Sequence, residues 1–593
     1  MSQKETRICQ NCKTEFEVES EDIEFYKKLN IPGPTFCHLC RRERLISWRN
    51  ERSLYHRTCP ATGKKIISIF RPDSPIVAYD RDYWWSDGWD PLDYGRDYDF
   101  SKPFFTQFRE LFERVPMPAV FNAFCVNSNY CNHIGKSKDC YLVFASWENE
   151  NLSYSAQCGS CRDSVDLLTA NNCELCYEII KGMKLYNVLF AENSENCSDS
   201  AFLFDCKGCQ HCFGCTNLRN KSYYFFNQPH SKEEYEEKIK EFDLGKLEDV
   251  GRARKLFEEE KSRSIRRPAF FMNTTNSTGD YLGQCESCTY CFGLREGAKD
   301  CKYCINGGYG LYDTYDSFGC GAGAELVYES IDTGFNGSRL LFNVAVYGSS
   351  SAEYSYNCHG STNLFGCVGL KGKEYCILNQ QYTKEEYEEL IPKIKAHMDE
   401  MPYEDKKGRI YKYGEFFPFD MCPYAYNDTK AHEHFPLSEN EAKSEGFIWR
   451  GEEKRDYKIT KRGDELPNNI QDAKDDITKE IIACAHEGKC DHGCTTAFRI
   501  TPQELLLYKK MHLSLPRMCP TCRYRERAAR RNPLKLWKRH CMCEGVESRN
   551  GIYRNTAVHD HGEESCPREF ETNYDPEKED IVYCEDCYNA EVV

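Results

Sequence analysis

Short apolar and aromatic segments alternate with small polar residues through the middle of the chain. Segments such as "KDCYLVF" (138–144) and "NCSDSAFLFDC" (196–206) are bounded by Asn, Ser, Gly and Cys. Short runs of this kind are typical of strands separated by turns. Cysteines recur at a spacing of nine, as in Cys197, Cys206 and Cys215. The pattern predicts a parallel β-solenoid with a period of about 18–20 residues. Several small zinc-bound knuckles are the alternative.

The solenoid pattern occurs twice. Residues 206–240, "CKGCQHCFGCTNLRNKSYYFFNQPHSKEEYEEKIK", align with residues 358–392 at a constant offset of 152. Each copy ends in a predicted helix, because Ser231 and Thr383 are followed three residues later by glutamate, as in a capping box. The fold class predicted is therefore multidomain and mainly β, with a duplicated parallel β-solenoid, capping helices and small flanking modules. The predicted domains are zinc module 1 (1–60), an aromatic and acidic connector (61–120), solenoid copy 1 (121–242), a basic helical linker (243–269), solenoid copy 2 (270–398), a linker (399–480), zinc module 2 (481–540) and zinc module 3 (541–593).

Both ends of the chain carry two close pairs of cysteines. In each of the two modules 24 residues separate the pairs, and a YKK triplet precedes the second pair at the same distance. Four thiolates in two pairs are the ligands that tetrahedral Zn²⁺ requires, and a second pair at the start of a helix is the treble-clef arrangement. A plain zinc ribbon is the alternative. The predicted ligands are Cys9, Cys12, Cys37 and Cys40 in module 1, and Cys490, Cys494, Cys519 and Cys522 in module 2.

The last 50 residues predict a third zinc site. Cys566, Cys584 and Cys587 are its predicted ligands. The fourth is either Cys543 or Cys541, of which we take Cys543, while the histidines of "HDH" (559–561) are weaker candidates. The predicted cofactor is therefore Zn²⁺, at about three ions per chain.

Composition narrows the cellular setting. The 593 residues include 37 cysteines, and the formal net charge is −16. The N-terminus "MSQKETRICQNC" shows no signal-peptide pattern, and no apolar run reaches the ~18–20 residues that span a bilayer. We expect a cytoplasmic protein with no membrane partner, in which cysteines act as metal ligands or buried apolar groups rather than disulfides.

Basic residues gather in the predicted helices of the first two zinc modules. Residues 517–540 hold nine Lys or Arg against one acid, and residues 41–57 hold six Arg against two acids. Such clusters suit phosphate contacts, so RNA, DNA or a ribonucleoprotein is a predicted partner. The alternative is that these helices pair with acidic residues of the same chain. The predicted nucleic-acid contacts are Arg41, Arg42, Arg44, Arg523, Arg525, Arg527, Arg530, Arg531, Lys535, Lys538 and Arg539.

The stretch "DCKGCQHCFGC" (205–215) places four cysteines on a strict period of three. The spacing is close to that of a bacterial ferredoxin run, but the last interval and the proline are missing. In the second copy the positions of Cys209 and Cys212 are Ser361 and Leu364. A position that accepts leucine favours core packing over metal binding or disulfides, although the two copies can differ in function.

The end modules resemble those of cysteine-rich bacterial proteins that carry "probable zinc-ribbon" (treble-clef-like) modules. The resemblance rests on a first cysteine pair, a tyrosine before the second pair, and an arginine directly after it, as in Tyr26 and Arg41 or Tyr508 and Arg523. It covers about a fifth of the chain, and the first pair of module 2 has one extra residue. It implies zinc binding and an intracellular location, but no activity.

Three functions follow from these patterns, and we expect the first. It is a non-enzymatic zinc-binding scaffold that docks on nucleic acid or a ribonucleoprotein through its basic helices. The second is a protein–protein assembly scaffold without nucleic acid. The third is a metal-redox protein that uses the solenoid cysteines. The sequence contains no Walker loop, no GxSxG, no HExxH, no kinase motif set and no GxGxxG after a predicted strand, which favours a protein that is not an enzyme without excluding one.

Overall fold

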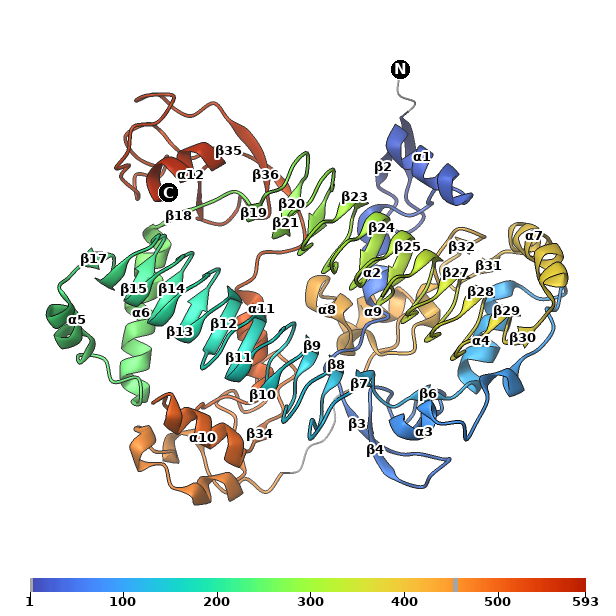
Figure 1. Ribbon diagram of the computed structural model, residues 1–593, viewed down its shortest axis with the longest axis horizontal. Coiled ribbons are helices and arrows are strands. Elements are labelled where there is room, and N and C mark those ends of the chain that lie inside the picture. Colours follow the sequence, from blue (N-terminus) through green and yellow to red (C-terminus); the bar gives the residue numbers. More distant parts are fainter. Residues whose placement is uncertain (1–3, 452–456) are drawn as a thin grey trace. The chain divides into compact units, whose positions relative to one another are not determined.

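The computed structural model describes residues 4–451 and 457–593 (Figure 1). Residues 1–3 of the predicted zinc module 1 and residues 452–456 of the predicted linker lie outside the described part. The chain divides into two compact units, and each combines two separate stretches of sequence. Unit 1 comprises residues 1–120 and 269–451, and unit 2 comprises residues 121–268 and 452–593.

Each unit is built around a parallel β-solenoid, which confirms the predicted fold class (Figure 1). Solenoid 1, in unit 2, consists of β7 (Asn122–Ala123), β8 (Asn132–Gly135), β9 (Phe144–Trp147), β10 (Glu150–Ser153), β11 (Arg162–Asn171), β12 (Tyr177–Met183), β13 (Tyr186–Glu192), β14 (Ser198–Phe204), β15 (Gln210–Thr216), β16 (Ser222–Phe225) and β17 (Gln228–Pro229). Solenoid 2, in unit 1, consists of β19 (Phe271–Met272), β20 (Gly279–Asp280), β21 (Leu282–Gly283), β22 (Cys291–Phe292), β23 (Lys299–Lys302), β24 (Tyr312–Phe318), β25 (Glu325–Ile331), β26 (Ser338–Leu341), β27 (Ser350–Glu353), β28 (Thr362–Phe365), β29 (Glu374–Ile377) and β30 (Gln380–Gln381).

The coils are shorter than the predicted period of about 18–20 residues. In solenoid 1 the amide of Cys212 donates to the Ser200 hydroxyl of the preceding coil, 12 residues earlier. Four successive steps between coils of solenoid 2, from Glu286 to Ser338, are one residue longer, as in the bond from the Asn343 amide to Ser330, 13 residues earlier. The spacing of nine seen in the sequence has a different meaning. One coil has twelve residues and four sides of three residues each, so a spacing of nine residues spans three sides. The thiol of Cys206 therefore lies against the carbonyl of Cys215.

Corners recur at every third residue. From Phe124 to Asp205 each third residue has a positive φ, and Gly208 and Gly214 continue the series. Left-handed backbone is costly for most residues, and Asn, Asp and Gly tolerate it best. Polar corners are also bonded between coils, because the Asn187 side chain donates to Asp199 at 2.8 Å. This corner spacing explains the abundance of Asn, Asp and Gly in the sequence.

The residues between the corners fill the interior of each solenoid. Cys206, Cys209, Cys212 and Cys215 are completely buried in one apolar cluster with neighbouring Leu, Ile, Val and Ala. The Cys206 thiol donates to backbone carbonyls of its own and the next turn, and burial raises its pKa well above the usual value. None of the possible metal-ligand groups among the described residues includes a solenoid cysteine. The four cysteines of "DCKGCQHCFGC" therefore form a packing ladder, a row of stacked side chains in the apolar interior of solenoid 1.

Helices close the far end of each solenoid. The last strand pairs, β16 with β17 and β29 with β30, are antiparallel hairpins. Helices α5 (Lys232–Ile239) and α7 (Lys384–Glu400) follow directly, and both carry the predicted capping boxes at Ser231 and Thr383. The remaining helices outside the cysteine modules are α3 (Arg81–Trp85), α4 (Phe104–Arg114), α6 (Leu247–Arg263), α8 (Lys430–His434) and α9 (Glu439–Ser444). Within the described ranges, no helix is both long and apolar enough to cross a bilayer.

Candidate metal centres and basic helices

Three cysteine modules share one architecture. In each, two sulfurs lie on the connection of an antiparallel hairpin and two lie at the start of a helix. Module 1 uses β1 (Glu5–Ile8), β2 (Glu15–Val18) and α2 (His38–Ile46), and α1 (Ser20–Leu29) joins them. Module 2 uses β33 (Ile482–Ala483), β34 (Ala497–Phe498) and α11 (Pro520–Ala529), joined by α10 (Pro502–Lys510). Module 3 uses β35 (Trp537–His540), β36 (Glu569–Thr572) and α12 (Glu585–Val592).

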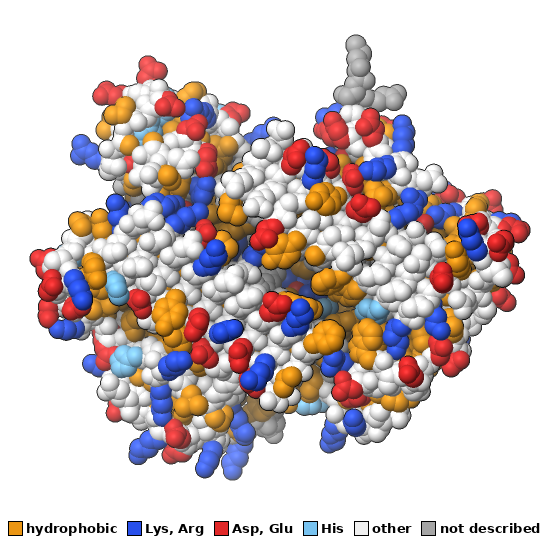
Figure 2. Space-filling view, in the orientation of Figure 1, with side chains coloured by type: hydrophobic (Ala, Val, Ile, Leu, Met, Phe, Trp, Pro, Cys, Tyr) orange, Lys and Arg blue, Asp and Glu red, His pale blue; other side chains and the backbone are white. Residues whose placement is uncertain are grey.

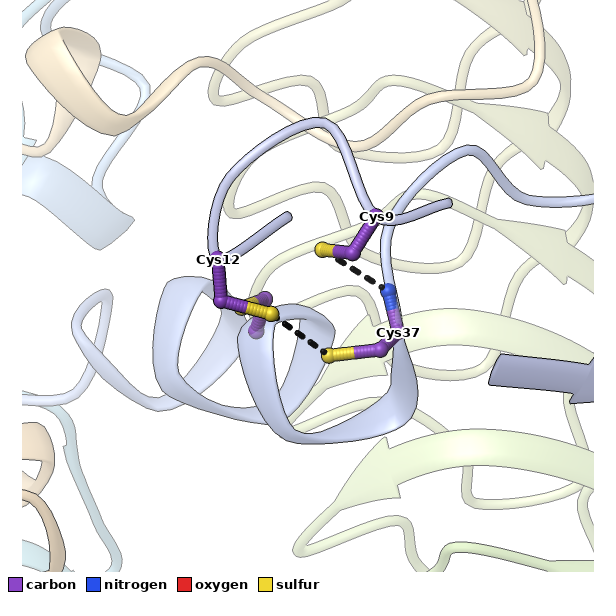
Figure 3. A group of neighbouring side chains, drawn as sticks. Cys9, Cys12 and Cys37 are labelled. Carbon is purple, nitrogen blue, oxygen red and sulfur yellow. Dashed lines mark hydrogen bonds between the residues drawn. The ribbon is translucent and has the colours of Figure 1, made fainter. Parts of the chain in front are cut away.

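Module 1 brings together the four predicted ligands. The sulfurs of Cys9, Cys12, Cys37 and Cys40 lie within 4.8 Å of one another, so the group could hold a metal ion. Figure 3 shows the sulfurs of Cys9 and Cys12 turned toward Cys37, which is the N-cap of α2. The Cys37 amide donates to Cys9 Sγ at 3.3 Å, and Cys12 Sγ is 3.7 Å from Cys37 Sγ.

The thiols of module 1 compete for protons. Hydrogen bonds from Cys37 and Cys40 lower the pKa of Cys9, whereas hydrogen bonding to Cys37 and Cys9 raises the pKa of Cys40. Four thiolates this close together repel one another unless a cation lies among them. The arrangement therefore suits a metal ion that replaces the protons.

The four-sulfur group of module 2 differs from the predicted set at one position. Cys484, Cys494, Cys519 and Cys522 form the four-sulfur group, so Cys484 takes the place predicted for Cys490. The amide of the N-cap residue Cys519 donates to Cys484 Sγ at 3.2 Å, as Cys37 does to Cys9 in module 1. The reason is the hairpin, because Cys484 directly follows β33 whereas Cys490 lies farther along the connection.

Module 3 forms its four-sulfur group in the same way. The group consists of Cys541, Cys566, Cys584 and Cys587, so its fourth sulfur is that of Cys541, whereas Cys543 lies in a neighbouring group. The amide of the N-cap residue Cys584 donates to Cys541 Sγ at 3.1 Å. Of the two cysteines of "HCMC", Cys541 therefore makes the hairpin-to-helix contact that Cys9 makes in module 1.

Cys490 and Cys543, which lie outside the four-sulfur groups, belong to two further groups of possible metal ligands. These groups are His486, Cys490, His492 and Cys522 in module 2, and Cys543, His559, His561 and Cys587 in module 3. Sequence reasoning missed His486 and His492 altogether. The signal was present in "HEGKCDHGC" (486–494), where two histidines flank a cysteine within one short connection.

The basic helix of module 1 is buried against solenoid 2 within unit 1. Arg41 pairs with Asp316 at 2.8 Å, and its side chain is 3% exposed. Arg44 is fully buried between the carboxylates of Glu329 and Glu415, at 3.0 and 3.1 Å. Asp316 and Glu329 belong to solenoid 2, where both are left-handed corner residues on neighbouring coils. The helix therefore uses its arginines inside the unit.

Module 2 repeats this arrangement on solenoid 1 within unit 2. Arg523 and Arg527 both pair with Asp166, at 3.0 and 2.8 Å, and all three side chains are buried. Arg530 pairs with Glu178 at 2.6 Å. The positive charges of Arg254 and Arg530, which both pair with Glu178, hold the pKa of this carboxyl down to about 2 despite its burial. Since Asp166 and Glu178 also occupy corners, the two units bury their basic helices in the same manner.

The remaining predicted nucleic-acid contacts fall into two classes. Arg42 is buried with its guanidinium 5.3 Å from the Tyr290 ring centre, Arg539 donates to backbone carbonyls including that of Asp580, and Arg531 donates to the Ala528 carbonyl. The second class consists of Arg525, which is half-buried, and Lys535 and Lys538, which are exposed; none of the three is in an ion pair that the described residues form.

Burial thus removes five of the predicted contacts from the surface that a nucleic acid could reach. They are Arg41, Arg42, Arg44, Arg523 and Arg527. The physical reason is that a guanidinium beside a solenoid carboxylate gains a charge-assisted hydrogen bond in a water-poor setting. These ion pairs agree with the alternative expectation, in which the basic helices pair with acidic residues of the same chain.

Comparison of the chain with protein-family models finds no match, and comparison with curated proteins finds no similar sequence. The resemblance to zinc-ribbon proteins stays a prediction.

Proposed function

We propose that the three four-cysteine groups bind Zn²⁺ and that the protein is a non-enzymatic scaffold for protein assembly. Four thiolates, two from a hairpin and two from a helix, fill all four coordination positions of Zn²⁺ and leave none for water or substrate. This is the ligand set of a structural zinc site. In this proposal the zinc ions fold the modules, the modules clamp the solenoids, and the solenoid surfaces bind protein partners.

The observation that carries the proposal is the burial of the basic helices. In both units a helix that begins at two cysteines of a four-sulfur group inserts arginines between carboxylates of neighbouring coils. Arg41 lies between Asp316 and Glu329, and Arg530 lies between Glu178 and Glu192. The side chains that suit phosphate best are therefore committed to holding module and solenoid together. A zinc module attached in this way acts as a fixed part of the unit.

The charge of the chain supports protein partners over nucleic acid. The formal net charge is −16, and an internal ion pair leaves this balance unchanged. A zinc ion bound by four thiolates adds a further charge of about −2 at each site. On the face seen in Figure 2, Lys and Arg side chains are interspersed with Asp and Glu. Nucleic-acid affinity depends on clustered cations, so this surface favours other partners.

Hydrogen exchange before and after metal removal tests the clamp. In the zinc-loaded protein we expect slow exchange in β24 and β25, which lie against α2. Stripping zinc with a chelator should unfold module 1 and speed exchange in these strands, while β28 and β29 serve as the internal control. Unchanged exchange in β24 and β25 after complete zinc loss would contradict the proposal.

Docking on RNA or DNA is a second candidate, carried by the three cations without an ion pair, Arg525, Lys535 and Lys538. Lys535 lies 4.8 Å from the Trp537 ring centre, which gives a charged and aromatic pair of the kind that contacts bases. If this candidate is right, a labelled oligonucleotide should bind less tightly at higher salt. The triple variant Arg525→Ser, Lys535→Ser, Lys538→Ser should then weaken binding. Lys384→Ser, an exposed change on α7, is the control.

A further inference from the structure

The connections between the first and second ligands differ greatly among the three modules. They contain two residues in module 1, nine in module 2 and 24 in module 3. The equivalent first ligands are Cys9, Cys484 and Cys541, and the equivalent second ligands are Cys12, Cys494 and Cys566. The two long connections are not needed to complete the four-sulfur group, because module 1 completes it with two residues. They are therefore candidates for a separate task.

Each long connection supplies one cysteine and two histidines beside the four-sulfur group. In module 2 the ligand atoms of His486, Cys490 and His492 lie within 4.8 Å of one another and of Cys522 Sγ. Cys490 Sγ is 3.7 Å from Cys522 Sγ. The buried Nδ1 atoms of both histidines make no hydrogen bond within the described structure. Two unpaired nitrogens beside two sulfurs form a set of four donors for a metal ion.

The other ring nitrogens of these histidines face carboxylates. His486 Nε2 is 3.7 Å from Glu526 Oε1, and His492 Nε2 is 3.7 Å from Asp491 Oδ1. Metal-bound histidines usually direct their second ring nitrogen at a carboxylate or carbonyl, which fixes the tautomer and the ring orientation. In module 2 both carboxylates lie near these nitrogens, although at 3.7 Å they are beyond hydrogen-bond distance, and the two Nδ1 atoms are the ones that face the sulfurs.

Module 3 reaches the same arrangement with an unrelated connection. His559 Nδ1 is 3.3 Å from Cys543 Sγ, and His561 Nε2 is 3.3 Å from Cys587 Sγ. The opposite nitrogens contact Glu591 Oε1 at 2.8 Å and the Glu564 carbonyl at 2.6 Å.

The two histidine pairs match in mutual geometry. The rings of His486 and His492 have centres 5.4 Å apart at 67°, and those of His559 and His561 have centres 5.4 Å apart at 68°. Connections of nine and 24 residues thus place two imidazoles alike beside the same helix cysteine. Agreement between two unrelated segments indicates a common requirement.

We propose that modules 2 and 3 are dinuclear metal sites in which one cysteine bridges two ions. Cys522 and Cys587 each belong to the four-sulfur group and to the Cys₂His₂ group of their module. Each is the counterpart of Cys40, which serves a single ion in module 1. The proposal deepens the zinc sites proposed above and depends on them. It assigns two further Zn²⁺ ions, each held by the bridging cysteine, a second cysteine and two histidines.

Charge balance favours the second ion. One Zn²⁺ among four thiolates leaves about two uncompensated negative charges in module 2, and the nearby Cys490 thiolate would add another. A second Zn²⁺ bound to Cys490 and two neutral imidazoles reduces the excess to about one negative charge for the pair of ions. All four donors come from the protein, so the added site is structural and closed.

Native mass spectrometry of the full chain tests the proposal. The zinc-loaded protein should carry five zinc ions. The variants His486→Gln with His492→Gln, and His559→Gln with His561→Gln, should each carry four, and their combination three. His540→Gln changes an exposed histidine of module 3 and should retain five.

Cobalt substitution supplies a readout that misfolding cannot imitate. Two Co²⁺ ions that share a thiolate couple magnetically, so the fully loaded protein should show weaker electron paramagnetic resonance per cobalt than the combined variant. The sulfur-to-cobalt absorption of the four-cysteine sites should persist in every histidine variant. Three zinc ions in the unmodified chain would overturn the dinuclear sites and leave the Cys₄ sites standing. No bound zinc would overturn both proposals.

Discussion

Replacing Arg44 by methionine measures how strongly a cysteine module is held to its solenoid. The Arg44 side chain is fully buried and lies 3.0 Å from Glu329 and 3.1 Å from Glu415. Methionine keeps apolar contact with the Phe36 ring but removes the cation. Two buried carboxylates then lack their main partner, and breaking a buried pair in this way costs about 3–5 kcal/mol. We expect this loss from the free energy of unfolding of unit 1.

Urea unfolding followed by tryptophan fluorescence checks the magnitude. A loss of about 3–5 kcal/mol corresponds to a fall in the urea midpoint of roughly 1–2 M, for a slope of about 3 kcal/mol per M. Lys28→Met is a matched control, because Lys28 pairs with Asp313 of the same solenoid at an exposed position. That change should alter stability by less than about 0.5 kcal/mol.

The pH dependence identifies the cause. Burial raises the pKa of Glu329 from 4.5 to about 7, although Arg44 opposes the shift. Between these values the folded state binds more protons than the unfolded state, so the stability contributed by this group falls as pH rises from 4.5 to 7. Without Arg44 the pKa rises further, so the loss should be smaller near pH 5 than near pH 8. A loss below about 1 kcal/mol at pH 8, or an equal loss at both pH values, would refute the reasoning.

Three further predictions concern unit 2. Arg523→Met should lower the free energy of unfolding by about 3–5 kcal/mol, whereas Arg525→Met, two residues away at a half-buried position without an ion pair, should change it by less than about 0.5 kcal/mol; thermal unfolding distinguishes them. Cys209→Ser should cost less than about 2 kcal/mol in urea unfolding and leave the zinc content unchanged, because serines such as Ser200 occupy the same inward positions. A loss of zinc would contradict the packing ladder. Ser231→Ala should cost about 1 kcal/mol through the α5 cap, seen as faster amide exchange at the start of α5; unaltered exchange would contradict this.

The solenoid could be predicted from the sequence, but its coil length could not be read from the cysteines. Nine-residue intervals such as Cys197 to Cys206 are conspicuous because cysteine is uncommon in most proteins. These intervals nevertheless span only three of the four sides of a coil. The true repeat of three is carried by inward positions that accept Cys, Ser, Leu, Ile, Val or Ala alike. The helix caps at Ser231 and Thr383 were predictable, since a capping box is a local pattern that needs no tertiary partner.

The metal centres show where spacing misleads. The pair in "CDHGC" (490–494) lies as far from its helix cysteines as Cys9 and Cys12 do from theirs, so spacing alone predicts Cys490 at the position that Cys484 occupies. The better signal is the apolar strand that ends immediately before the first ligand, as Ile482–Ala483 does before Cys484. Strand pairing fixes which cysteine faces the helix, and the number of residues in the connection does not.

The arginines of the basic helices could be located but not interpreted. Composition alone cannot distinguish a cation that faces solvent from one whose partner is far away in sequence. Asp166 and Glu329 look like ordinary solenoid corners, and their pairing with Arg523 and Arg44 depends on which module packs on which solenoid. Sequence order suggests neighbours, whereas each unit joins distant segments.

The interleaving of the two units has a consequence for synthesis on the ribosome. Arg527 donates to the Tyr154 carbonyl, 373 residues earlier, so solenoid 1 is completed long before the helix that covers it. At translation rates of about 5–20 residues per second, roughly 20–75 s pass between the synthesis of Asp166 and that of its partner Arg527. In unit 1 the order is reversed, because Arg44 precedes Glu329 by 285 residues. There the cysteine module emerges first and waits for its solenoid. The nascent chain thus passes through a stage in which one module without its solenoid and one solenoid without its module are present together.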